Sequence, residues 1–350
     1  MKEFNYLVSG TAPELYPAHL FFGLLWVGED DSVEIPMRYP FQGPWGEPIS
    51  NRLMEREQFP APFLLDMVWL SPVEQVFYSL YERLPVEILE DLLSETDEKT
   101  GQPICSHLVV GMAPSGIVAL WAYGLKKSTL VRCWRGEPVH VEMSDFLPMN
   151  PDMPLEEFCS DTLRNLPEVQ ENQEQNGFPP VDLYENYMRQ YRYRYQVLFG
   201  KWDEEEETWT EYGEEEAVPE LDSLKEALFD GSFDKTNDGR LMAYHEAGKP
   251  QKLALEWHVR KWVYEAYFWF LDEGIRAGFD SVCGEEPDQE TDLIVRIDPS
   301  QDKVEVSLNR EGMEEPYVLP EEAYELIIFR NRLESFRSEN YGQGTGAWIW

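Results

Sequence analysis

The densest group of chemically active side chains is the acidic segment DEEEETWTEYGEEE at residues 203–216. Carboxylates can transfer protons, bind cations or contact basic proteins, and here aromatic side chains interrupt them. Aromatic residues within a charged rim are typical of protein-binding surfaces. The alternative is a solvated loop, since runs of like charge are usually exposed. The candidate partner-binding residues are Asp203, Glu204, Glu205, Glu206, Glu207, Trp209, Tyr212, Glu214, Glu215 and Glu216.

Three further carboxylates stand at predicted strand ends, where catalytic groups often occur. They are Asp66 and the neighbouring pair Asp272 and Glu273, which follows a strongly apolar segment. Such groups could work as a general acid and a general base. The simpler interpretation is structural, because Asp272 suits a helix N-cap and Glu273 the first helical turn. We expect capping, and keep catalysis by these carboxylates as the alternative.

Other segments resemble known sites only in part. Ser115 lies in GMAPSG but lacks the flanking glycines of a nucleophile elbow, so a hairpin turn is expected. Asp234 begins DKTNDG like a calcium loop, yet His245 stands at position twelve, where that loop needs a glutamate. The five histidines show no HxxxH or HExxH spacing; they are His19, His107, His140, His245 and His258. The sequence therefore predicts no catalytic residues, no metal ligands and no cofactor.

The elements that would position these side chains are mostly strands. Hydrophobic alternation and turn signals predict strands in the ranges 18–38 (a hairpin), 63–70, 105–135, 262–270, 293–308 (a hairpin) and 324–329. Helices are expected at 71–84, 86–94, 155–166, 182–198 and 272–282, and a polar linker at 168–180. The helix at 71–84 has a capping-box signature, with Ser71 at the N-cap, Pro72 at N1 and Glu74 at N3.

Hairpins outnumber regular strand–helix–strand units, which predicts an α+β fold of mainly antiparallel sheets with flanking helices. We expect an N-terminal α+β region at 1–150, a peripheral helical and acidic insert at 151–235, and a C-terminal α+β region at 236–350. The first and last regions are expected to pack together, as one continuous domain or two. Residues 189–196, RQYRYRYQ, are expected to form internal salt bridges on a helix.

Composition narrows the classes of partner. The 350 residues contain 29 Lys and Arg against 67 Asp and Glu, a net charge of −38. Such a charge repels nucleic-acid phosphates and anionic lipid surfaces and favours basic partners. We therefore expect a basic protein partner, no nucleic acid and no membrane insertion; the oligomeric state is left open.

Cysteine usage and the N-terminal residues point to a compartment. The four cysteines are Cys105, Cys133, Cys159 and Cys283, none in a CxxC pair, which favours buried free thiols in a reducing compartment. MKEFNYLVSG has neither a long apolar run nor a lipobox cysteine. These features predict a cytoplasmic protein.

Several motifs together resemble a bacterial family, domain of unknown function 2931. They are Tyr16-Pro17, Trp45-Gly46, VWLSPVEQVFYSLYERLP (68–85), LVVGMAPSGIVALWAYG (108–124), YFWFLDEGIRAGF (267–279) and FRSENYGQGTGAWIW (336–350). The resemblance covers nearly the whole chain and is weakest at 150–235. It supplies no activity and no catalytic residues.

Relatives in this family include proteins that look like secreted lipoproteins, whereas this sequence lacks a lipobox. Other members stand beside type VI secretion effector genes, which implies a candidate role as immunity proteins. We therefore expect a non-enzymatic protein-binding protein that occludes a toxin or effector; an enzyme of undetected mechanism is the alternative. The apolar ending Trp348-Ile349-Trp350 predicts a terminus that is docked and buried.

Overall fold

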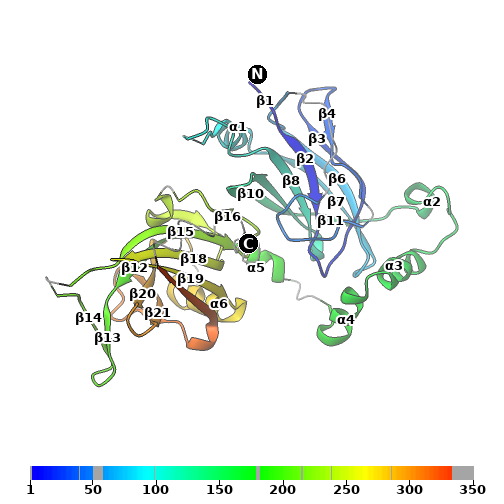
Figure 1. Cartoon of the computed structure of the whole chain (residues 1–350). Coiled ribbons are helices and arrows are strands. Elements are labelled where there is room, and N and C mark those ends of the chain that lie inside the picture. The colour runs from blue at the N-terminus through cyan, green and yellow to red at the C-terminus, as the bar shows by residue number, and fades with distance from the viewer. Residues whose placement is uncertain are drawn as a thin grey trace. The chain divides into compact units, whose positions relative to one another are not determined.

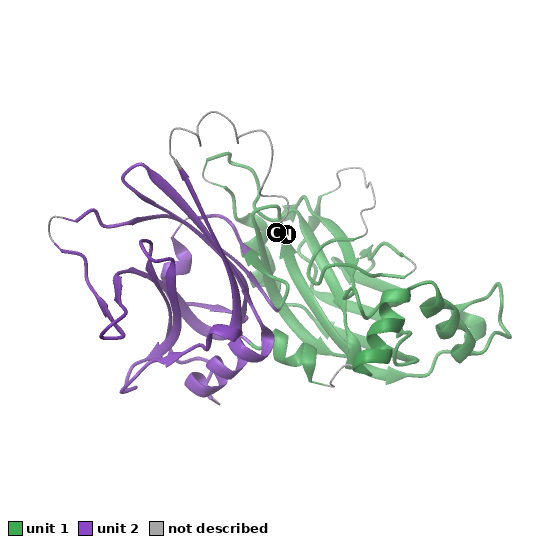
Figure 2. Cartoon of the chain, turned by 60° about the horizontal axis from the view of Figure 1, so that its bottom comes forward, with its two compact units in different colours: residues 1–189, 230–233 green, residues 190–229, 234–350 purple. Residues whose placement is uncertain are grey.

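The computed structural model describes residues 2–38, 40–49, 58–97, 99–178, 182–213, 216–237, 239–284 and 286–332. The chain divides into two compact units (Figure 2). Unit 1 comprises residues 1–189 and 230–233, and unit 2 comprises residues 190–229 and 234–350. Both contain mainly antiparallel sheet, so the predicted α+β class is confirmed at that level. The expected burial of Trp348 and Trp350 concerns residues outside those described.

Unit 1 contains two sheets that share one hydrophobic core (Figure 1). The first has the strand order β2 (Leu7–Thr11), β8 (His107–Met112), β9 (Ile117–Tyr123), β10 (Lys127–Arg135), with β2 parallel to β8. The second, wholly antiparallel, has the order β11 (Glu137–Val139), β7 (Val76–Arg83), β6 (Leu64–Ser71), β3 (His19–Trp26), β4 (Ser32–Glu34). Trp69 and Leu120, one from each sheet, are fully buried in this core. The predicted hairpin at 18–38 and the antiparallel unit at 105–135 are therefore confirmed.

The remaining elements of unit 1 are short. They are the paired strands β1 (Glu3–Phe4) and β5 (Phe59–Pro60), the 3-10 turn η1 (Pro114–Gly116), and the helices α1 (Val86–Ser94), α2 (Met143–Phe146), α3 (Leu155–Arg164), α4 (Pro167–Asn176) and α5 (Leu183–Met188). Residues 230–233 include the first residue of β16 (Phe233–Asp234). Trp45 anchors its loop, because its ring lies 4.8 Å from that of Trp121 and 5.4 Å from that of Tyr184.

Unit 2 also contains two sheets around a core of its own. One has the antiparallel order β15 (Glu220–Leu228), β18 (Pro250–Val259), β19 (Trp262–Phe270), β23 (Tyr324–Arg332). The other has the order β17 (His245–Ala247), β12 (Tyr191–Phe199), β20 (Thr291–Asp298), β21 (Lys303–Arg310), β22 (Tyr317–Val318), with β12 parallel to β20. The other elements are β13 (Lys201–Asp203), β14 (Thr208–Thr210), η2 (Arg240–Met242), α6 (Asp272–Cys283) and η3 (Glu321–Ala323). Helix α6 buries Ile275, Phe279 and Val282, which recur on one face at helical spacing.

The helix predicted at 71–84 is wrong. Ser71 ends β6, a turn follows with Gln75 at a φ of 57°, and residues 76–83 form β7. The apolar spacing suggested a helix because other side chains cover both faces of β7. Tyr78 and Leu80 enter the main core, whereas Phe77 faces a separate cluster with Leu70 and Cys159. A strand covered on both faces loses its simple alternation and can imitate helical spacing.

Two further expectations are also wrong. Residues 167–176 form helix α4 instead of a polar linker, with Pro167 in the first turn, a position that tolerates proline. The helix expected over 182–198 ends at Met188, and β12 replaces the rest. The alternating tyrosines of β12 are buried, because they face the core while the arginines between them face outward. Arg192 and Arg194 do form salt bridges, with Glu290 and Asp292, but from a strand.

Candidate functional site

The acidic segment forms a β-hairpin in unit 2. Strand β13 pairs with β14, which places Trp202 opposite Trp209 and Asp203 opposite Thr208. The Asp203 carboxylate closes the turn by accepting hydrogen bonds from the backbone N–H groups of Glu205 and Glu206, at 2.9 and 3.1 Å. Of the two forms that the sequence allows for this segment, an acidic loop or a hairpin tip, the structure shows the hairpin. We call residues 201–213 the acidic hairpin.

An aromatic pair forms one face of the acidic hairpin. The rings of Trp202 and Trp209 lie 5.4 Å apart with an interplanar angle of 62°, and both side chains are half-buried. The indole N–H of Trp209 donates to Glu305 on β21 at 3.2 Å. Cations from the neighbouring strands lie over both rings, with Arg296 5.6 Å from the Trp209 ring and Lys303 5.3 Å from the Trp202 ring. These contacts hold the aromatic pair in one orientation.

Backbone contacts fix the acidic hairpin to the turn between β20 and β21. The buried carboxylate of Asp298 accepts a hydrogen bond from the N–H of Trp202 at 2.9 Å, and from the N–H of Ser300 at 2.8 Å. The Gln301 side chain donates to the carbonyl oxygen of Trp202 at 3.1 Å. An anchored hairpin loses less conformational freedom on binding than a free loop does.

The carboxylates of the turn project into solvent. Glu204, Glu205, Glu206 and Glu207 are all exposed, as is Glu211. Glu216 is paired instead. It forms an ion pair with Lys201, whose hydrogen bond lowers the pKa of that carboxyl, and it also accepts the N–H of Gly213 at 2.8 Å.

Tyr212 stands beside this ion pair and is half-buried. The Lys201 ammonium lies 5.7 Å from its ring, and burial raises the pKa of Tyr212 to about 12. The predicted residues Glu214 and Glu215 lie outside the described part of the chain. The acidic hairpin therefore presents exposed negative charge beside a fixed aromatic surface, which is suited to contacting cationic groups.

The strand-end carboxylates do not form one catalytic group. Asp66 belongs to unit 1 and lies inside β6, where partial burial raises the pKa of its carboxyl. Asp272 and Glu273 belong to unit 2, and Glu273 is exposed. Asp272 is not the N-cap that we expected, because Leu271 occupies that position. Burial raises the pKa of the Asp272 carboxyl, and its Oδ1 atom is buried without a hydrogen-bond partner.

The partial motifs form turns. Ser115 lies in the hairpin between β8 and β9 with a φ of 60°. The Asp234 carboxylate accepts the backbone N–H of Thr236 at 2.8 Å, which makes a local Asx turn. Within the described ranges, no group of three or more His, Cys, Asp or Glu residues is arranged to hold a metal ion. The four cysteines are free, and Cys105, Cys159 and Cys283 are buried.

A buried polar cluster in unit 2 escaped the sequence analysis. Glu226 on β15 is 3% exposed, and its Oε2 atom accepts hydrogen bonds from the hydroxyls of Tyr193 and Tyr195 at 3.2 and 2.8 Å. His245 Nε2 lies 3.6 Å from Glu226 Oε1, while Nδ1 lies 3.0 Å from the carbonyl oxygen of Ala243. The signal was present in the sequence, since Tyr193 and Tyr195 show the two-residue period of a strand.

Comparison with known proteins identifies one family. The model described as "Protein of unknown function (DUF2931)" matches residues 1–180. Two of the motifs on which the resemblance rests, at 267–279 and 336–350, lie beyond the matched residues. No curated protein and no solved structure matches the chain. Among the described residues, no helix is both long and apolar enough to cross a membrane.

Proposed function

Because the chain belongs to the DUF2931 family of proteins of unknown function, we propose its role from its own surfaces: it is a non-enzymatic protein that binds a basic protein partner through the acidic hairpin. The observation that carries the proposal is the anchored Trp202–Trp209 pair beside four exposed glutamates. Aromatic anchors supply most of the affinity at protein interfaces, while rim charges guide the encounter.

The finer proposal is that the partner is a secreted toxin or effector, and that the chain is its immunity protein in the cytoplasm. It is supported by the resemblance to relatives encoded beside type VI secretion effector genes. Occlusion requires only an interface of ordinary size, about 800 Å² on each protein, with a few aromatic anchors.

A pull-down from the native host with the tagged full-length chain tests the proposal, and the neighbouring gene's product is examined first. We expect that product to bind the chain and to lose its toxicity on co-expression. Binding without loss of toxicity would retain the binding role and remove the immunity role. If that product does not bind, and the pull-down recovers no partner that depends on the acidic hairpin, the proposal fails.

A second candidate function is an enzyme that uses Asp272. It is favoured by the raised pKa of this carboxyl and its unpartnered, buried Oδ1 atom, since perturbed carboxyls often mark functional sites. Arg276 lies 3.8 Å from the other oxygen and opposes the rise. Changing Asp272 to Asn distinguishes the two candidates. A binding protein should still neutralise the toxin, because its acidic hairpin is intact, whereas an enzyme that uses Asp272 should lose its activity.

A further inference from the structure

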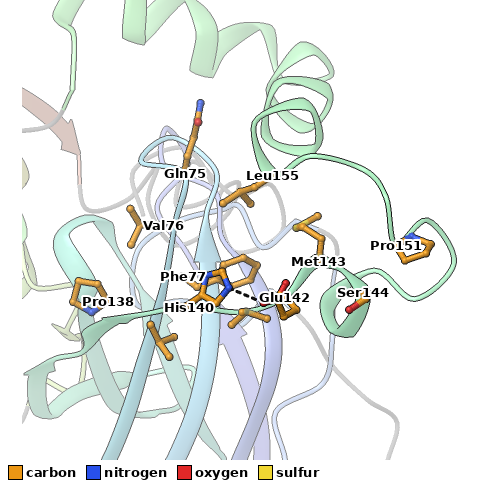
Figure 3. A pocket seen from close by; sticks show the side chains of 12 residues that line it. Gln75, Val76, Phe77, Pro138, His140, Glu142, Met143, Ser144, Pro151 and Leu155 are labelled. Carbon is orange, nitrogen blue, oxygen red and sulfur yellow. Dashed lines mark hydrogen bonds and ion pairs between the residues drawn. The ribbon is translucent and has the colours of Figure 1, made fainter.

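A groove of about 560 Å³ opens beside β11, the edge strand of the second sheet of unit 1 (Figure 3). Its apolar lining comes from β7, from β11 and the residues after it, and from helices α2 and α3. These residues are Val76, Phe77, Val139, Val141, Met143 and Leu155. The volume lies within the range of about 300–1,000 Å³ that is common for ligand pockets.

The groove exists because helices cover only part of this face of the sheet. The Phe77 side chain points to the face opposite the main core, where its ring lies 5.0 Å from that of Phe146. Phe146 in turn lies 5.3 Å from Phe158 of α3. Val139 on the edge strand is 37% exposed. An apolar floor therefore stays open beside this aromatic cluster.

One carboxylate, that of Glu142, lines the groove. The exposed His140 and Glu142 side chains pair across 3.0 Å at the groove, as the dashed line in Figure 3 marks. A second carboxylate, that of Glu137, lies on the edge strand β11 and is also exposed. The stretch 137–157, which supplies much of the lining, contains no lysine or arginine. Cationic side chains are the complement of these carboxylates.

Methionine adds adaptability, because Met143 lines the groove. Methionine side chains are flexible and polarisable, and they are frequent at surfaces that adjust to peptide ligands. An apolar floor with a methionine, beside the carboxylates of Glu137 and Glu142, favours a peptide with one large apolar side chain between basic residues.

We propose that this groove binds an extended segment of a partner protein, with an aliphatic or aromatic side chain on the Val139–Leu155 floor and lysine or arginine beside Glu137 and Glu142. Pro138 lacks an N–H, which is typical of an edge strand protected from further pairing. Recognition therefore depends on the side chains more than on an added strand. The inference shares with the proposed function only the premise of a protein partner, and it concerns unit 1, whereas the acidic hairpin belongs to unit 2.

Selection of twelve-residue random peptides displayed on phage, against the full-length chain, tests the inference. We expect enrichment of a large apolar residue next to lysine or arginine. The best synthetic peptide is then titrated by fluorescence anisotropy. Changing Val139 to Gln or Glu142 to Gln should each weaken its binding about tenfold, a loss typical of interface residues that contribute to affinity. The matched control is Val318→Gln, because Val318 is another exposed edge-strand valine, in unit 2.

Four outcomes overturn the inference. One is a selection without apolar and basic enrichment, and another is a peptide whose affinity is unchanged in both groove variants. The third is a concentration-dependent dimer that Val139→Gln abolishes, which would assign the groove to a second copy of the chain. Loss of peptide binding on neutralising Glu204–Glu207 would assign the peptide to the acidic hairpin. That result would be consistent with the proposed function, but it would exclude the groove as the peptide-binding site.

Discussion

The carboxylate of Glu74 accepts a hydrogen bond from the backbone N–H of Ser115 at 2.9 Å, and so joins the turn between β6 and β7 to the turn between β8 and β9. The Tyr78 hydroxyl donates to the same oxygen at 3.2 Å. One side chain thereby links the two sheets of unit 1. The two turns belong to the segments 68–85 and 108–124, which carry the family resemblance within the matched residues.

Changing Glu74 to Ala should lower the free energy of unfolding by about 1–3 kcal/mol, because hydrogen bonds to a charged group are lost and the Ser115 N–H loses its acceptor. Glu74→Gln retains an acceptor oxygen and should cost less. Urea unfolding followed by circular dichroism measures both. Glu82→Gln, an exposed change on β7, is the control and should have little effect. Equal stability of the Ala variant and the control would refute this role.

Gly116 should resist substitution more strongly than Gly101. Both have a positive φ, 75° and 66°, so alanine is strained at each position. At Gly116 an added Cβ would also lie 2.6 Å from the carbonyl oxygen of Gly136 and 2.9 Å from the Tyr78 ring, whereas at Gly101 it meets no atom within 4 Å. We expect Gly116→Ala to cost about 1–3 kcal/mol more than Gly101→Ala. Thermal unfolding of the two variants side by side measures the difference.

Protonation of His19 should lower the free energy of unfolding in mild acid. Burial lowers the pKa of His19 to about 4 from an ordinary value of 6.5, so the folded state binds the proton less tightly than the unfolded chain does. As the pH falls from 6.5 towards 4, stability on the order of 3 kcal/mol should be lost. In His19→Gln this part of the loss should be absent. Parallel pH profiles for the two proteins over this range would contradict the prediction.

His245 should have the opposite pH dependence, with stability lost as the pH rises. Burial alone would lower its pKa, but the negative charge of the nearby Glu226 carboxylate, with smaller contributions from the hydrogen bond to Ala243 and from Asp234, raises it above the ordinary value. The stabilisation is thus complete below about pH 6.5 and is lost as the pH rises through the folded-state pKa. Unfolding measured from pH 6 to 9 should show wild type losing stability relative to His245→Gln. A constant difference across this range would exclude the effect.

Neutralising the tip of the acidic hairpin should slow partner association. With Glu204, Glu205, Glu206 and Glu207 all changed to Gln, surface plasmon resonance with the partner from the pull-down should show a lower association rate and a weaker salt dependence. Folding should change by no more than about 0.5 kcal/mol for each site. The control changes four exposed glutamates elsewhere in unit 2 to Gln: Glu311, Glu314, Glu315 and Glu322. If control and tip variants slow association equally, net charge alone is responsible.

Much of the local structure followed from the sequence. The hairpins at 18–38 and 293–308, helix α6 and the acidic hairpin each have one covered face or a strong turn signal, so their pattern is local. The class of fold followed from the number of such hairpins. The expectation of exposed charge at Glu204–Glu207 also needed no tertiary information, because four adjacent carboxylates cannot be buried together without partners.

Tertiary contacts decided the rest. Residues 76–83 are a strand because Tyr78 and Phe77 are covered from opposite sides, by the main core and by the Phe146 cluster. A single sequence does not show which faces will be covered, so the apolar spacing of this segment suited a helix equally well. The contacts of Glu226 with Tyr193 and of Glu74 with Ser115 join residues 33 and 41 positions apart. Only the folded sheets bring such groups together, since their positions depend on strand order and register, which no local pattern encodes.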